Sequence, residues 1–312
     1  MVTRYVLLVG GLLSIIGSVQ AEEQPEMPRI EEGFVAIPDG SIFYKKLSYP
    51  ATATAVPLVF INGGPGLSHD HLVDMARRLA VDRPVVVYDQ LGCGKSVTAA
   101  GVEVVWDVPR FVEELACLLD HLGGDRWYVL GHSWGGTVAL SYTAHHQKKV
   151  AALVLSSPLI GTKEWAEDTR ECLTLMPAEL QETIARHEKA GTTDSPEFQN
   201  AAQKFQDAFL WHSGQMPPFA GTFNLDMYRI MWGPYEFDAT GTLKDLSLWG
   251  ELETISVPML FCYGQFDWTR ERTARRVTQA KRVVFEECGH VSFMEQPLVY
   301  ATEIRKFFQS CD

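Results

Sequence analysis

Short apolar runs at intervals along the chain are the feature that most limits what it can fold into. Four of them are too short for helices and lead into Gly, Asp or Ser: VPLVFINGG, RPVVVYDQLG, RWYVLGHS and VAALVLSSP. Their Val-rich composition is typical of strands buried on both faces. Amphipathic segments lie between them, such as 107–123, which opens with Asp107 and closes with Gly123 as a capped helix does. The alternation predicts an α/β fold with a mostly parallel central sheet and helices on both faces.

The rhythm of strands and helices divides the chain into a core and an insertion. A hairpin is predicted at 33–49, with its turn at Pro-Asp-Gly. The first part of the core is expected at 32–160. Residues 161–246 contain no strand-like run and form charged, helix-rich segments, which predicts an inserted helical cap. Strand patterns then resume in the second part of the core, 247–312, which ends in a helix.

The charge of the chain argues against a nucleic-acid partner. It carries 27 Lys and Arg against 39 Asp and Glu, a formal net charge of −12. Binding to a phosphate backbone needs concentrated Lys and Arg. The densest basic patch is RERTARR, residues 270–276, and its spacing is typical of a solvated helix face.

Residues 1–21 have the composition of a signal peptide. Arg4 precedes an apolar stretch at 6–17, and Val19 and Ala21 stand at the small-residue positions before a cleavage site. The stretch is shorter than the about 20 apolar residues that span a bilayer. A cleaved signal, a secreted or periplasmic protein and no stable membrane association are therefore expected; a retained anchor is the alternative.

The cysteines give no sign of a metal site. The six cysteines are scattered without a CxxC pair or zinc-type spacing, so no metal site is predicted. No cofactor is expected either. Export would allow one or two disulfides, which the sequence cannot pair.

The segment YVLGHSWGGTVAL places one hydroxyl on a tight bend between a strand and a helix. Ser133 is flanked two residues away by Gly131 and Gly135, in a Gly-x-Ser-x-Gly pattern. Such a turn lifts the hydroxyl clear of the sheet and needs small neighbours because backbone passes close by. The context of a strand before and a helix after predicts that Ser133 is a nucleophile.

A serine hydroxyl needs a base to react, and the base needs an acid to orient it. Of nine histidines, His290 alone follows the insertion, in a loop just past a predicted strand. Asp267 ends another predicted strand 23 residues earlier. Asp245 is a poorer candidate because no strand leads into it. The chain order Ser133, Asp267, His290 predicts a catalytic triad.

Two loops are candidates for donors to a developing oxyanion. Gly63 and Gly64 follow the first buried strand and permit unusual backbone angles. The predicted donors are the backbone N–H groups of Gly64 and of Trp134, the residue after the nucleophile. The loop YDQLGCGKS is interpreted as a structural turn shaped by Asp89 and its glycines.

Together, NGGPG, DQLGCGKS and GHSWGG, followed by Asp267 and His290, resemble the proline iminopeptidase family of α/β-hydrolases. The resemblance covers the chain from about Glu32 to its end. It implies the α/β-hydrolase fold with an inserted cap and a metal-independent serine hydrolase. It further implies release of N-terminal residues from short peptides or amino-acid amides, and substrates with a free amine.

The resemblance also implies a role for Glu236, which falls where the family's cap carries an acid that holds the substrate's α-amino group. Trp232 and Tyr235 lie beside it in the sequence. The chain departs from the family pattern at Asn62, where His is usual, and at Gly214, where a second cap acid is expected. The second departure argues against a strict requirement for proline. An esterase or lactonase with the same triad is the alternative, and a binding protein on a degenerate hydrolase fold is the third reading. The sequence leaves the oligomeric state open.

Overall fold

A computed structural model describes residues 27–269 and 271–312, whose strands form one nine-stranded sheet. The strand order is β1-β2-β4-β3-β6-β7-β8-β9, and β5 pairs with β2. Pairing is antiparallel among β1, β2, β4 and β5 and parallel from β4 to β9. The strands are β1 (Arg29–Ile37), β2 (Gly40–Ser48), β3 (Leu58–Ile61), β4 (Val85–Tyr88), β5 (Val97–Thr98), β6 (Trp127–His132), β7 (Val150–Ser156), β8 (Met259–Gly264) and β9 (Lys281–Phe285).

The predicted hairpin and the predicted parallel strands are confirmed. In the hairpin, Ile37 pairs with Gly40, so Pro38 and Asp39 form its tight turn. Each of the four apolar runs contains one parallel strand, and every residue of β3, β4, β6 and β7 is buried. Burial on both faces explains why these strands are apolar throughout.

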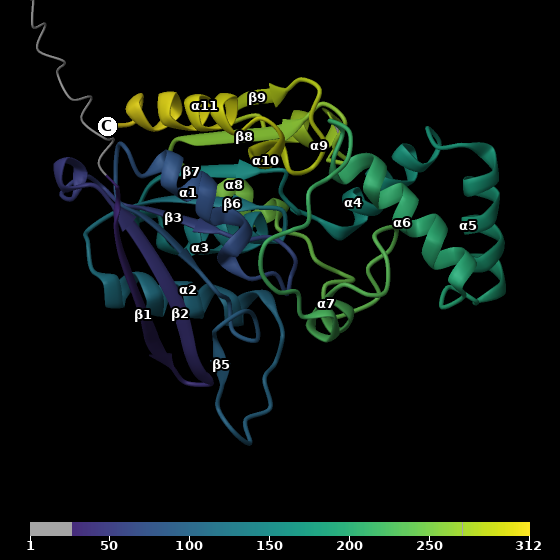
Figure 1. Ribbon diagram of the computed structural model, residues 1–312, viewed down its shortest axis with the longest axis horizontal. Coiled ribbons are helices and arrows are strands. Elements are labelled where there is room, and N and C mark those ends of the chain that lie inside the picture. The colour runs from purple at the N-terminus through teal and green to yellow at the C-terminus, as the bar shows by residue number, and fades with distance from the viewer. Residues whose placement is uncertain (1–26, 270) are drawn as a thin grey trace, which may run out of the picture.

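Helices cover both faces of the sheet, as predicted (Figure 1). Along β3, Val59 and Ile61 pack in one apolar cluster with α2 (Val108–Leu122), α3 (Trp134–His146) and α8 (Trp249–Thr254). The alternate residues Leu58 and Phe60 pack in a second cluster with α1 (Val73–Leu79) and α11 (Pro297–Gln309). The opposite orientation of successive side chains on a strand produces these two layers.

The helix predicted at 107–123 has the predicted ends. The Asp107 carboxylate accepts a hydrogen bond from the backbone N–H of Arg110 at 3.0 Å, and Gly123 has a φ of 72° at the other end. Side-chain capping of the first N–H groups and a glycine with positive φ at the C-terminus are what the sequence pattern indicated.

The segment predicted as a cap contains four helices and no strand within its described residues, 161–246. These helices gather to one side of the core (right in Figure 1). Two isolated bridges, between Leu67 and Phe223 and between Gly161 and Ser247, link the segment to the core. Its helices are α4 (Thr162–Leu173), α5 (Ala178–Ala190), α6 (Pro196–Leu210) and α7 (Leu225–Met231).

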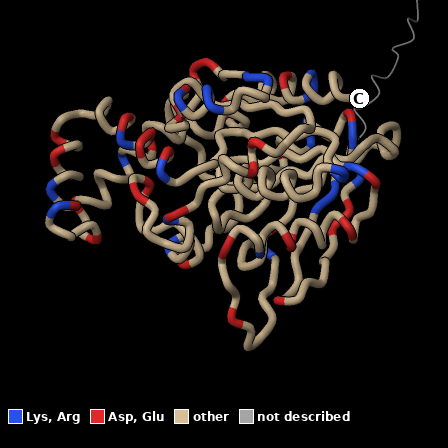
Figure 2. Tube along the Cα trace, turned by 180° about the vertical axis from the view of Figure 1, so that it is seen from behind, with Lys and Arg blue, Asp and Glu red and all other residues tan. Residues whose placement is uncertain are grey.

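The basic patch is only in part a solvated helix face, because two of its arginines pair with acidic side chains of the cap. α9 (Glu271–Arg276) faces α4, where Arg272 Nε lies 3.0 Å from the carboxylate of Asp168. Arg276 pairs with Glu164 on the same cap helix. Elsewhere along the trace, Lys and Arg are interspersed with Asp and Glu over both core and cap (Figure 2).

Free thiols are present at Cys93, Cys117, Cys262, Cys288 and Cys311. None of these residues therefore forms one of the disulfides that export would allow. The predicted signal peptide lies outside the described residues. None of the helices formed by residues 27–269 and 271–312 is both long and apolar enough to cross a bilayer.

Candidate active site

Ser133 occupies a strained turn between β6 and α3. Its φ and ψ are 55° and −121°, a region that side chains seldom adopt. A Cβ on Gly131 would lie 2.1 Å from the carbonyl oxygen of Gly135, and one on Gly135 would lie 2.3 Å from that of Ile61. Glycine is therefore required on both sides of Ser133, for the steric reason inferred from the sequence.

The structure brings Asp267 and His290 into direct contact. Asp267 follows β8 and His290 follows β9, so parallel strands carry both to the sheet edge where β6 delivers Ser133. The Nδ1 atom of His290 lies 2.8 Å from the Asp267 carboxylate, and both side chains are buried. The Trp268 ring packs 4.5 Å from the imidazole. The contact with Asp267 fixes the tautomer of His290 that has hydrogen on Nδ1, and it leaves Nε2 as an acceptor.

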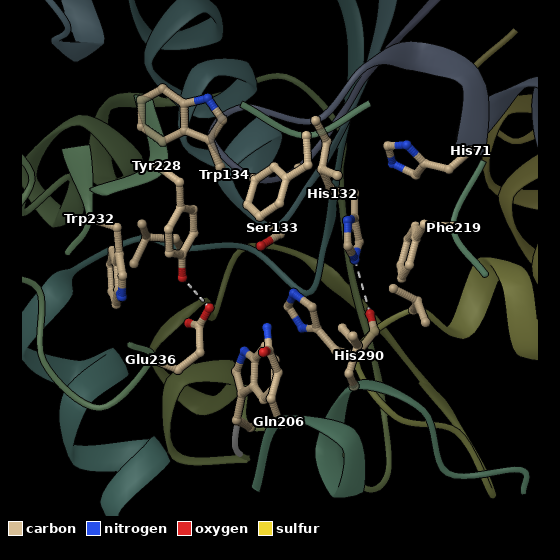
Figure 3. A pocket seen from close by; sticks show the side chains of 18 of the residues that line it. His71, His132, Ser133, Trp134, Gln206, Phe219, Tyr228, Trp232, Glu236 and His290 are labelled. Carbon is tan, nitrogen blue, oxygen red and sulfur yellow. Dashed lines mark hydrogen bonds between the residues drawn. The ribbon is translucent and has the colours of Figure 1, made fainter. Parts of the chain in front are cut away.

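Ser133 and His290 line the same cavity of about 260 Å³. Its wall is formed by the carboxyl edge of the sheet on one side and by cap residues on the other. The side chains of Ser133 and His290 both reach into the middle of the cavity (Figure 3). The volume is below the roughly 300–1,000 Å³ of pockets for drug-sized ligands, which suits a substrate of one or two residues.

The two predicted oxyanion donors also line this cavity. Gly64 has a φ of 116° and is followed by a cis peptide bond to Pro65. Trp134 is the first residue of α3, and the first N–H groups of a helix have no partner within it. Both N–H groups thus belong to segments that border Ser133.

Gln90 connects these two segments, and the sequence interpretation missed it. Its side-chain nitrogen donates to the backbone oxygen and side-chain oxygen of Asn62 at 3.1 and 3.2 Å. Its side-chain oxygen accepts from the indole N–H of Trp134 at 2.8 Å. All three residues are buried. Asn62, which replaces the usual family histidine, in turn donates to the carbonyl of Leu67. The rest of the loop agrees with the structural interpretation, since Asp89 accepts from the backbone N–H of Lys95 at 2.8 Å.

Gln90→Met is expected to lower kcat about tenfold with little change in KM. Loss of one oxyanion donor costs about 10²–10³ in kcat, and Gln90 aligns such donors without being one. Trp134→Phe removes the same hydrogen bond from its other end and keeps the backbone N–H. Because both changes break one link, the double variant should lose little more than either single variant. If steady-state kinetics show that the two single losses in kcat add fully in the double variant, the hydrogen bond between Gln90 and Trp134 does not have the proposed role.

His132 is a second residue that the sequence interpretation did not use. Its Nε2 lies 3.0 Å from the backbone oxygen of His290, a hydrogen bond drawn in Figure 3. Burial lowers the pKa of His132 well below its ordinary value, so the ring is neutral and Nε2 carries the hydrogen it donates. The residue before Ser133 thereby ties the serine turn to the histidine loop.

Glu236 reaches the cavity from the cap, among aromatic rings. The hydroxyl of Tyr228 donates to its carboxylate, and Trp232 lies on the same wall (Figure 3). Desolvation raises the pKa of Glu236 above its usual 4.5, against the effect of the Tyr228 hydrogen bond. Among the described residues that line the cavity, Glu236 is the one member of the group Asp, Glu, Lys and Arg.

The position expected for a second acid does not reach the cavity. Gly214 is exposed and lies outside its lining. Two neutral amides, Gln203 and Gln206 on α6, line the wall from the cap. Within residues 27–269 and 271–312, no group of three His, Cys, Asp or Glu side chains could hold a metal ion.

Comparison with known proteins agrees with this geometry. A model of the alpha/beta hydrolase fold matches residues 56–297. The proline iminopeptidase of Heyndrickxia coagulans is 37% identical over 288 residues, 89% of this chain and 99% of its own. That of Saccharolobus solfataricus is 31% identical, over 89% of this chain and 92% of its own. The crystal structure of a Mycobacterium smegmatis proline iminopeptidase superposes with a TM-score of 0.80 at 26% identity, covering 90% of this chain and 98% of that one. The α/β-hydrolase fold is confirmed, and the chain belongs to the proline iminopeptidase family.

Proposed function

We propose that this protein is a serine aminopeptidase that releases an N-terminal residue, proline or another small one, from peptides or amino-acid amides. The observation that carries the proposal is the placement of Glu236 in the same cavity as Ser133 and His290. A carboxylate among Tyr and Trp rings attracts an ammonium group by charge and by cation–π interaction. An ammonium group also favours the ionised form of Glu236, which opposes the upward pKa shift.

The proposed reaction passes through an acyl-enzyme. Ser133 Oγ attacks the carbonyl carbon while its proton moves to Nε2 of His290, and the N–H groups of Gly64 and Trp134 stabilise the oxyanion. The C–N bond then breaks, and Nε2 gives its proton to the leaving nitrogen. Asp267 holds the Nδ1 hydrogen and stabilises the imidazolium. Water attacks the ester in the same way and frees Ser133.

The proposal is tested by blocking the substrate's amine. Acetylating the α-amine of an aminoacyl ester is expected to lower kcat/KM about 10- to 100-fold, since hydrogen bonds to charged groups contribute about 1.5–3 kcal/mol. Glu236→Gln should remove most of that difference, whereas Glu179→Gln, an exposed cap change of equal charge, should not. Equal rates for free and acetylated esters would identify an esterase or lactonase instead.

We also propose that residues 1–21 are a cleaved signal peptide and that the mature protein is secreted or periplasmic. The support is the charged start, short apolar stretch and small-residue site in the sequence. Mass spectrometry of protein from the extracellular or periplasmic fraction should show a chain that begins at Glu22. Recovery of a chain that still begins at Met1 would contradict this.

A further inference from the structure

The cavity continues past the reaction centre, away from Glu236. On the Glu236 side, the Trp165 ring lies 5.9 Å from Trp232 and 5.7 Å from His290. A single ring, that of Trp165, therefore separates the imidazole of His290 from the wall that carries Glu236. The Tyr228 ring, which donates to Glu236, lies 5.4 Å from Phe223 on the same side.

On the other side of His290, a second series of rings leads to the far end of the cavity. His132 lies 4.8 Å from His290 and 4.9 Å from Phe293. The Phe293 ring lies 6.2 Å from His71, which in turn lies 5.6 Å from Phe219. Figure 3 shows His71 and Phe219 across Ser133 and His290 from Glu236.

The far end is lined without a charged side chain. Leu210, Phe219 and Val291 pack in one apolar cluster with Phe293 and line the cavity with His71. Met216 lines it from the same cap segment as Phe219, three residues before it in the chain. His71 is 6% exposed, and burial lowers its pKa to about 4, so the ring is neutral at neutral pH. The nearby carboxylate of Asp70 does not line the cavity and accepts from the Ser68 hydroxyl at 2.7 Å. An ionic group placed here would lose hydration without gaining an opposite charge.

The direction of a bound peptide follows from the reaction geometry. With the amine at Glu236 and the carbonyl carbon at Ser133, the leaving nitrogen must meet His290, which protonates it. The rest of the peptide then continues away from Glu236. We infer that the far end of the cavity is a leaving-group subsite for an apolar residue, so that the preferred peptides carry an apolar residue in second position; it is formed by His71, Leu210, Met216, Phe219 and Val291. The inference rests on the proposed aminopeptidase function.

The test measures kcat/KM for prolyl and alanyl dipeptides that differ only in the second residue. Leu or Phe in second position is expected to exceed Asp by about tenfold or more, the usual effect of burying one apolar side chain. Phe219→Ala should shrink this ratio several-fold. Phe223→Ala is the matched control, because Phe223 belongs to the same cap segment but lies beside Tyr228; it should leave the ratio unchanged.

A second variant, which should gain selectivity, keeps the test informative even if Phe219→Ala fails to fold. Met216→Lys places an ammonium group at the far end and should raise kcat/KM for the Asp dipeptide relative to the Leu dipeptide. If free-amine substrates are cleaved with equal kcat/KM for Leu and Asp, or if Met216→Lys leaves the ratio unmoved, the subsite is refuted and the proposed function stands. If cleavage does not depend on the free amine, the proposed function itself fails.

Discussion

Ser133→Ala is expected to lower kcat by about 10⁶, the loss seen when the nucleophile of a serine hydrolase is removed. Without Oγ there is no atom to form the acyl-enzyme, and the remaining donors and base give only residual catalysis. The measurement is turnover of a prolyl arylamide at high enzyme concentration. Ser141→Ala is the matched control, since Ser141 lies buried on α3, the helix that follows Ser133, outside the cavity lining, and should retain activity.

Covalent labelling separates loss of the nucleophile from loss of the fold. A fluorophosphonate probe should modify the unaltered protein at Ser133, and peptide mapping by mass spectrometry would locate the label. Ser133→Ala should keep its melting temperature and take up no label. Turnover that survives in this variant, or label found at another residue, would overturn the proposed mechanism.

Asp267→Asn is expected to lower kcat by about 10⁴ while the protein remains folded. The carboxylate lies 2.8 Å from Nδ1 of His290 and accepts its hydrogen. An amide in its place can donate to Nδ1, which moves the hydrogen to Nε2, and an imidazole with hydrogen on Nε2 cannot accept the proton of Ser133.

Asp245→Asn is the matched control for this change. Asp245 is the acid that the sequence ranked second, and the structure leaves it exposed and outside the cavity lining. It should keep full kcat, and circular dichroism should show both variants folded. A loss of less than tenfold in Asp267→Asn, or a comparable loss in Asp245→Asn, would reject the assigned role of Asp267.

Features that depend on neighbours along the chain were predictable. The cap of α2 at Asp107 and its end at Gly123 are set by hydrogen bonds within a few residues. The turn at Ser133 is likewise readable, because glycine at 131 and 135 is required wherever this strand-to-helix bend forms. The proposed roles of Ser133, Asp267 and His290 followed from the places where predicted strands end.

Features that depend on the approach of distant segments were not. Gln90 stood in a loop interpreted as a turn, and nothing next to it in the sequence signals that its amide meets Asn62 and Trp134. Arg272 looked solvated because its partner, Asp168, is 104 residues away on the cap. The family resemblance pointed to Glu236, but its hydrogen bond to Tyr228 required the cap fold.

The sequence by itself determined the alternation of buried strands and helices, the bend that presents one hydroxyl and the order of the acid and base behind it. These follow from periodicity, burial and turn chemistry, which act over a few residues. Only the tertiary structure decided which polar groups pair across the sheet edge, where the cap closes the cavity and which of its ends is free of charge. Such contacts form between residues that packing brings close together in space. The order of residues along the chain does not give the distance between distant segments in the fold.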